Sequence, residues 1–135
     1  IREVSEKRGG RVVKNLGDGL MVIFADAGKA IDCSAEMQRQ VEADDDQLGL
    51  RVGVHAGELL RDGNDFFGTT VIIARRLCDG AESGQTIVST ATRALAEGCT
   101  ESSFRPLGAL NLKGLGAPVE AESLVWADPV ESLVG

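Results

Sequence analysis

Hydrophobic and polar positions change their spacing several times along the chain, and each change predicts a different element. Two short apolar runs, Val12–Lys14 and Leu20–Phe24, enclose "NLGDG", which is typical of a hairpin with Gly17 and Gly19 at positive φ. Between residues 26 and 41 apolar side chains recur at helical spacing, and the acidic "EADDD" follows. The first third of the chain therefore predicts a hairpin followed by an amphipathic helix.

The rest of the chain predicts strands that alternate with helices. The stretch "LGLRVGVHAGELLRDGNDFF" alternates and turns at "DGND", which predicts one long strand, a tight turn and a second strand. A helix is expected over "TTVIIARRLCDGA", with Thr69 or Thr70 near its cap, then a buried strand "QTIVS" and a helix "STATRALAEG" that Gly98 closes. The segments "FRPLGALNLKGLGAP" and "VEAESLVW" predict a final hairpin. We expect an α/β (α+β) domain whose mixed or antiparallel sheet has helices packed on one side.

Length and composition fit one globular domain. The 135 residues are 43% hydrophobic and 26% charged, and no apolar run approaches the ~20 residues of a membrane span, so we expect no membrane contact from this segment. The opening "IREVSEKRGG" is too charged for a secretory signal and reads as the end of a helix, so we expect the chain to begin inside an element. Three widely spaced cysteines favour a cytoplasmic location with buried free thiols: Cys33, Cys78 and Cys99.

The net charge of −7 argues against one class of partner. An acidic surface repels a nucleic-acid backbone, so we expect no nucleic-acid partner. A small phosphate ligand remains compatible with this charge, because a few local cations or a bound metal can reverse the potential in one cleft.

The tip of the first predicted hairpin holds a candidate metal ligand. Asp18 lies between two glycines, which leave its carboxylate open to a hard cation such as Mg²⁺ or Mn²⁺. The same "GDG" is also ordinary turn chemistry, so the residues alone leave both interpretations open.

Five strings occur in a fixed order along the chain: "GGRVVKNLGDGLMVIF", "LRVGVHAGE", "DFFGTTVIIARRL", "GQTIVSTATR" and "FRPLGALNLKGL". Together they resemble the class III nucleotidyl cyclase catalytic domain of many bacterial adenylate cyclases. The resemblance runs from about Gly9 to Val125. It implies the ferredoxin-like cyclase fold over residues 1–127, with 128–135 as a C-terminal tail.

The resemblance assigns a role to five residues. Asp18 matches the second of the family's two metal-binding aspartates. Lys14 matches the lysine that hydrogen-bonds the adenine ring, and Asp65 matches the aspartate that partners this lysine, a pair that reads ATP and not GTP. Arg76 matches the arginine that stabilises the transition-state phosphate, and Lys113 matches a lysine that holds the triphosphate.

These roles imply an adenylate cyclase that converts ATP to 3′,5′-cyclic AMP and pyrophosphate with two Mg²⁺ or Mn²⁺ ions. In the family one protomer supplies the metal ligands, and its partner supplies the base readers, the arginine and the phosphate lysine. The resemblance therefore implies a head-to-tail homodimer with its sites at the interface.

Two departures from the family pattern qualify this function. Ile72 replaces an asparagine that orients the ribose, and it has neither donor nor acceptor to do so. Its neighbour Arg75 points about 100° away from Arg76 on a helix, so we do not expect it to compensate. The family's first metal aspartate lies on a strand ahead of Gly9 that these 135 residues do not contain, so we expect weak or no activity from this chain alone.

Two functions from different classes remain open at this point. One is an adenylate cyclase catalytic domain, and the other is a catalytically degenerate cyclase-like domain that binds nucleotide or dimerises with a competent partner. The remaining conspicuous residues are expected to be structural: His55 as a satisfied core or interface histidine, Phe66, Phe67 and Trp126 as packing residues, and Asp44 to Asp46 as a solvated helix end.

Overall fold

The computed structural model describes the chain in seven segments: residues 11–15, 20–23, 27–43, 50–56, 60–62, 65–100 and 102–126. Side chains are described for 27–41, 50–56, 68–100 and 102–126. The predicted helix end at residues 1–10, the acidic residues 44–46 and the tail at 128–135 lie outside these segments.

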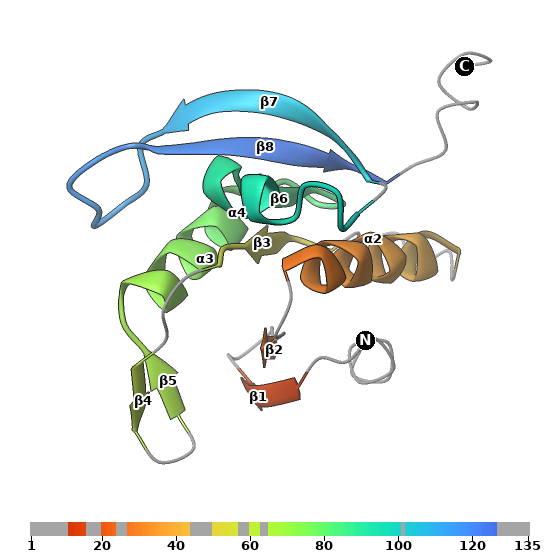
Figure 1. Cartoon of the computed structure of the whole chain (residues 1–135). Helices are drawn as coiled ribbons and strands as arrows, with labels where there is room; N and C mark the ends of the chain where they lie inside the picture. The colour runs from red at the N-terminus through yellow and green to blue at the C-terminus, as the bar shows by residue number, and fades with distance from the viewer. Residues whose placement is uncertain are drawn as a thin grey trace.

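The centre of the structure is a four-stranded mixed sheet (Figure 1). Its strands are β3 (Val52–Val54), β6 (Thr86–Ser89), β8 (Val119–Val125) and β7 (Ser103–Leu110), in that spatial order. β3 and β6 run parallel, whereas β6–β8 and β7–β8 are antiparallel. The mixed sheet, the buried strand "QTIVS" and the final hairpin are therefore confirmed.

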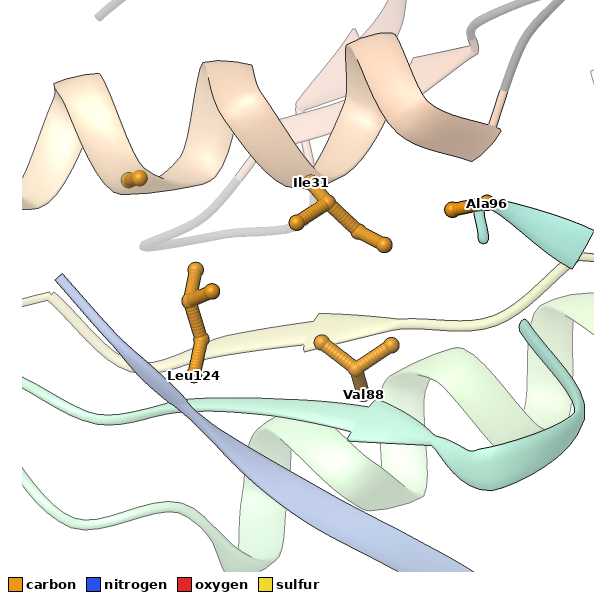
Figure 2. Packing of buried hydrophobic residues seen from close by; sticks show 5 residues of the cluster. Ile31, Val88, Ala96 and Leu124 are labelled. Carbon is orange, nitrogen blue, oxygen red and sulfur yellow. The ribbon is translucent and has the colours of Figure 1, made fainter. Parts of the chain in front are cut away.

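Helices cover both faces of this sheet, so the expectation of helices on one side was wrong. Val88 of β6 packs with Ile31 of α2 (Ala27–Ala43) and with Ala96, which follows α4 (Thr90–Leu95). The next residue toward the N-terminus, Ile87, packs instead with Leu77 of α3 (Thr69–Gly80). Figure 2 shows α2 on one side of the strands and the fainter ribbon of α3 on the other.

The physical reason lies in β6. All four of its residues are buried, so both faces of this strand need cover. α3 also connects the parallel strands β3 and β6, and such a crossover helix packs on one face of the sheet. α2 then occupies the opposite face.

The first predicted hairpin is confirmed, with ends that differ by about a residue. β1 (Arg11–Asn15) and β2 (Leu20–Ile23) pair antiparallel, with a register shift between Val12 and Lys14. The last pair, Asn15 with Leu20, sets residues 16–19 between the strand ends, and these four residues, like Phe24, lie outside the description.

The long strand expected after residue 50 is wrong, although the second strand is confirmed, and residues 63 and 64 of the expected turn lie outside the described segments. β3 ends at Val54, and β4 (Leu60–Asp62) pairs with β5 (Asp65–Phe67) in a separate two-stranded sheet. The chain leaves the central sheet because the backbone N–H of Ala56 donates to Thr92 Oγ1 at 2.7 Å, at the beginning of α4. A side chain of another element thus replaces a ladder partner.

Helix ends and one cysteine differ in detail from the expectations. α3 begins at Thr69, but its cap residue is Gly68 at φ 111° and makes no side-chain cap bond. α4 ends at Leu95, and Gly98 at φ 81° lies in the turn beyond it. Cys99 belongs to that surface turn, so it is exposed, whereas Cys33 is buried as expected.

The described helices include none that is both long enough and apolar enough to cross a bilayer.

Gly53 sets the distance between α3 and β3. A Cβ on Gly53 would meet the carbonyl oxygen of Ala74 and would lie 2.5 Å from the backbone nitrogen of Cys78. Backbone atoms of a helix cannot move aside singly, so the whole of α3 would have to shift. We predict that Gly53→Ala lowers the free energy of unfolding by about 1–3 kcal/mol, measured by urea denaturation.

Gly80 supplies the control for this prediction. A Cβ there would meet nothing within 4 Å, so Gly80→Ala should leave the unfolding midpoint unchanged or raise it slightly. Equal midpoints for the two variants would contradict the close approach at Gly53.

Candidate active site

α3 carries two of the predicted site positions on the face turned away from the sheet. Leu77 is fully buried against the sheet, whereas Ile72 is 46% exposed and Arg75 is exposed. At 100° per residue, Ile72, Arg76 and Asp79 form one stripe along the outer side of the helix. Ile72 and Arg76 are therefore neighbours, one turn apart.

Arg76 combines a paired end with an unpaired buried nitrogen. Its side chain is 33% exposed, and Nη1 lies 3.4 Å from Oδ2 of Asp79. Its Nε is buried and has no hydrogen-bond partner among the described residues. A buried N–H without a partner is costly, so this donor is suited to an acceptor that comes from outside the described part of the chain.

Lys113 lies in the connection between β7 and β8, on the α3 side of the sheet. Leu112 packs, with Ile73 of α3, against the cluster around Leu77. The backbone N–H of Leu115 donates to the carbonyl oxygen of Leu112, and Gly114 at φ 81° completes this turn. Lys113 is thus an exposed residue on a turn that is anchored by Leu112, which packs on the α3 side of the sheet.

The other predicted site residues fall on the hairpins. Lys14 pairs with Met21 beside the register shift in β1, and Asp65 is the first residue of β5, paired with Asp62. One residue, Gly68, separates β5 from α3, so the strand that begins at Asp65 leads directly into the helix of Arg76. The structure describes the backbone of Lys14 and Asp65 but not their side chains, and Asp18 lies outside the described residues.

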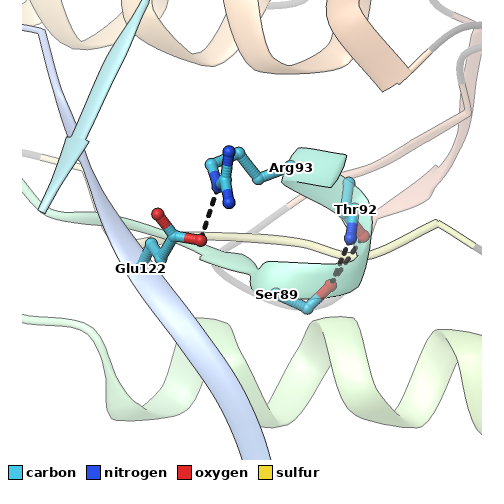
Figure 3. A network of polar contacts seen from close by, with 4 residues as sticks. All are labelled: Ser89, Thr92, Arg93 and Glu122. Carbon is cyan, nitrogen blue, oxygen red and sulfur yellow. Dashed lines mark hydrogen bonds and ion pairs between the residues drawn. The ribbon is translucent and has the colours of Figure 1, made fainter. Parts of the chain in front are cut away.

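A polar network at the beginning of α4 escaped the sequence analysis. Ser89 is the N-cap of α4, and its Oγ accepts from the backbone N–H of Thr92 at 3.3 Å (Figure 3). The same Oγ lies 2.6 Å from Thr92 Oγ1 and 2.7 Å from Nδ1 of His55. His55 is half-buried, which lowers its pKa by desolvation, and its Nδ1 has a hydrogen-bond partner in Ser89. A serine directly before the helical run was the available signal for the cap.

A pocket of about 460 Å³ opens beside His55, between Thr90 at the beginning of α4 and Glu120 near the beginning of β8.

Arg93 of α4 binds the carboxylate of Glu122 on β8 at 2.6 Å, and this hydrogen bond raises the pKa of Arg93 (Figure 3). The ion pair joins α4 to the sheet. Trp126 packs against the core as expected, and its Nε1 donates to the carbonyl oxygen of Gly84 at 2.8 Å.

Within the described residues, no group of three or more His, Cys, Asp or Glu side chains is arranged to hold a metal ion. The metal ligand that the sequence predicts, Asp18, is not among them.

Comparisons with known proteins agree on one family. The family model for the adenylate and guanylate cyclase catalytic domain matches residues 1–124. A Rhizobium meliloti relative with an adenylate cyclase name is 33% identical over 116 residues, which are 82% of this chain and 20% of the relative. An adenylate cyclase of Streptomyces coelicolor is 38% identical over 84 residues, 62% of this chain and 22% of that protein. The chain spans about a fifth of the length of these two relatives.

Solved structures show the same fold. The adenylate/guanylate cyclase/hydrolase of Silicibacter pomeroyi has a TM-score of 0.82 at 26% identity, over 93% of this chain and 78% of that one. The adenylyl cyclase CyaB of P. aeruginosa has a TM-score of 0.76 at 22% identity, over 93% and 76%. The resemblance stated from the sequence is confirmed, and the chain belongs to the family of class III adenylate and guanylate cyclase catalytic domains.

Proposed function

We propose that this chain is an adenylate cyclase catalytic domain, which forms 3′,5′-cyclic AMP and pyrophosphate from ATP. The observation that carries the proposal is Arg76, whose buried Nε has no partner among the described residues, in a domain of the cyclase family. Bidentate guanidinium donors are suited to phosphate oxygens. Lys113, on an anchored turn over the same face, adds a second positive charge.

The reaction needs these charges because it develops negative charge on phosphate oxygens. The 3′-oxygen of ATP forms a bond to the α-phosphorus, the bond from that phosphorus to the leaving oxygen breaks, and pyrophosphate departs. Arg76 would donate to the oxygens of the phosphorus under attack, where the charge of the transition state develops. Lys113 would bind the triphosphate and neutralise the pyrophosphate that leaves.

ATP specificity is assigned to Lys14 and Asp65. Lys14 would hydrogen-bond the adenine ring, and the Asp65 carboxylate would orient the ammonium group of Lys14. Both residues lie on hairpins, and the β4–β5 hairpin leads directly into the helix of Arg76.

Asp18 would hold a divalent cation. The pairing of Asn15 with Leu20 leaves Asp18 in a four-residue connection, and a carboxylate flanked by glycines suits the hard ions Mg²⁺ and Mn²⁺. In this family two such ions supply activation of the 3′-hydroxyl and neutralisation of the leaving oxygens. These 135 residues hold one of the two family aspartates, so we expect low activity from this chain alone.

The second candidate function is a degenerate domain that binds nucleotide, or dimerises with a competent partner, without catalysis. Ile72 favours it, because a 46% exposed isoleucine stands one turn from Arg76 where the family has an asparagine. Two substitutions separate the two functions.

We predict that Arg76→Ala lowers cyclic AMP production by about 10²- to 10³-fold, because one donor to the transition-state charge is lost. The assay is conversion of ATP in the presence of Mn²⁺, with GTP as the competing substrate. Arg75→Ala is the matched control: it removes the same charge from the adjacent exposed position and should change the rate little. Asp18→Ala should abolish the activity. Equal effects of the two arginine variants would overturn the role of Arg76.

We predict that Ile72→Asn raises kcat, by up to about 10²-fold, because it restores a positioned polar contact to the ribose. Ile72→Ala removes the same apolar side chain without adding an amide and should not raise kcat. A wild-type chain and an Ile72→Asn variant that both bind ATP and form no cyclic AMP would favour the degenerate domain instead.

The proposal also includes a head-to-tail homodimer, because the family divides its site residues between two protomers. We predict a dimer in multi-angle light scattering at high protein concentration. Lys14→Ala should weaken ATP binding without shifting this equilibrium. A species that stays monomeric at every concentration would leave the composite sites unassembled and would count against catalysis by this chain.

A further inference from the structure

Asp79 is the acidic neighbour of Arg76 on the outer stripe of α3. It lies three residues after Arg76, and its Oδ2 is 3.4 Å from Nη1. Asp79 is 56% exposed and Arg76 is 33% exposed. Asp79 is not among the site residues predicted from the sequence.

The contact engages Nη1 of the guanidinium, whereas Nε has no partner among the described residues. A guanidinium offers five N–H donors in a fixed plane, and the Nε edge can donate in parallel to two oxygens of one acceptor. Asp79 contacts Nη1, on the other side of the group from that edge. The Nε is buried and unpartnered among the described residues, so the Arg76 side chain is held with this donor unused.

Stability does not explain this pair. An exposed ion pair between residues three apart on a helix contributes little to stability, and a single contact of 3.4 Å is weak even for that class. A weak contact can still select one orientation of a side chain with several rotatable bonds. The selected orientation places the unpaired donor where no described residue satisfies it.

We propose that Asp79 is a positioning residue for Arg76. It restrains Nη1 and so leaves Nε to donate to a phosphate oxygen of the nucleotide. This inference rests on the proposed function, because it takes Arg76 as the group that binds the transition-state phosphate. Asp79 itself touches no reacting atom.

The nearby charges supply a control. Glu82 is an exposed carboxylate just beyond the end of α3, and its backbone N–H donates to Oε1 of Gln85. No described contact joins the Glu82 carboxylate to Arg76. Glu82→Gln therefore removes the same charge from the same end of the helix and leaves the Arg76 contact intact.

The experiment compares Asp79→Asn, Asp79→Glu and Glu82→Gln with the wild-type chain. We predict that Asp79→Asn lowers kcat about two- to fivefold, with KM for ATP and the urea midpoint unchanged, because orientation matters most in the transition state. Asp79→Glu keeps a carboxylate within reach of Nη1 and should restore kcat. Glu82→Gln should match the wild type.

A second readout does not depend on turnover. The Nε–H signal of Arg76 in a ¹H–¹⁵N spectrum, assigned by its loss in Arg76→Lys, should shift or broaden in Asp79→Asn and keep its position in Glu82→Gln. A wild-type chain that binds no ATP would refute the proposed function, whereas this signal would still report whether Asp79 restrains Arg76. An unchanged signal in Asp79→Asn, or a loss of kcat in Glu82→Gln equal to that in Asp79→Asn, would overturn the positioning role.

Discussion

The contact between α3 and β3 at Gly53 is the constraint on which the position of the candidate site depends. The backbone atoms of Ala74 and Cys78 occupy the space that a side chain at residue 53 would fill. α3 is therefore held against the sheet by main-chain proximity as well as by Leu77. Arg76 lies between these backbone contacts in the sequence, and so its Cα is fixed by the same approach. Gly53 thus fixes the position of the backbone from which the Arg76 side chain extends.

Most of the elements could be predicted from the sequence, because each depends on a local pattern. Local signals in the sequence indicate the four buried residues of β6, the helical spacing of α2 and the hairpins β1–β2 and β4–β5. The end of β3, and the presence of helices on both faces of the sheet, could not be predicted in this way. The first depends on a bond from Ala56 to Thr92, 36 residues away, and the second depends on how a parallel crossover packs.

The candidate site could be predicted only where it follows a motif. Arg76, Lys113 and Ile72 were identified by their places in short strings, and the structure adds that Arg76 and Ile72 share one stripe of α3. The contact of Arg76 with Asp79 was not predicted, because a pair three residues apart is common on helices and carries no signal by itself. The unpaired Nε could not be predicted from the sequence either, because the burial of one atom depends on packing from several elements.

The cap of α4 has a consequence for the proton of His55. The backbone N–H of Ala56 donates to Thr92 Oγ1. The hydroxyl groups of Thr92 and Ser89 both have described acceptors only if Thr92 donates to Ser89 Oγ and Ser89 donates to Nδ1 of His55. In that arrangement Nδ1 is the acceptor, and the neutral ring would carry its proton on Nε2. A doubly protonated ring would have no acceptor to offer, and Ser89 would have to turn its hydrogen away. In that arrangement the neutral imidazole of His55 contributes to the helix cap at Ser89, 34 residues further along the chain.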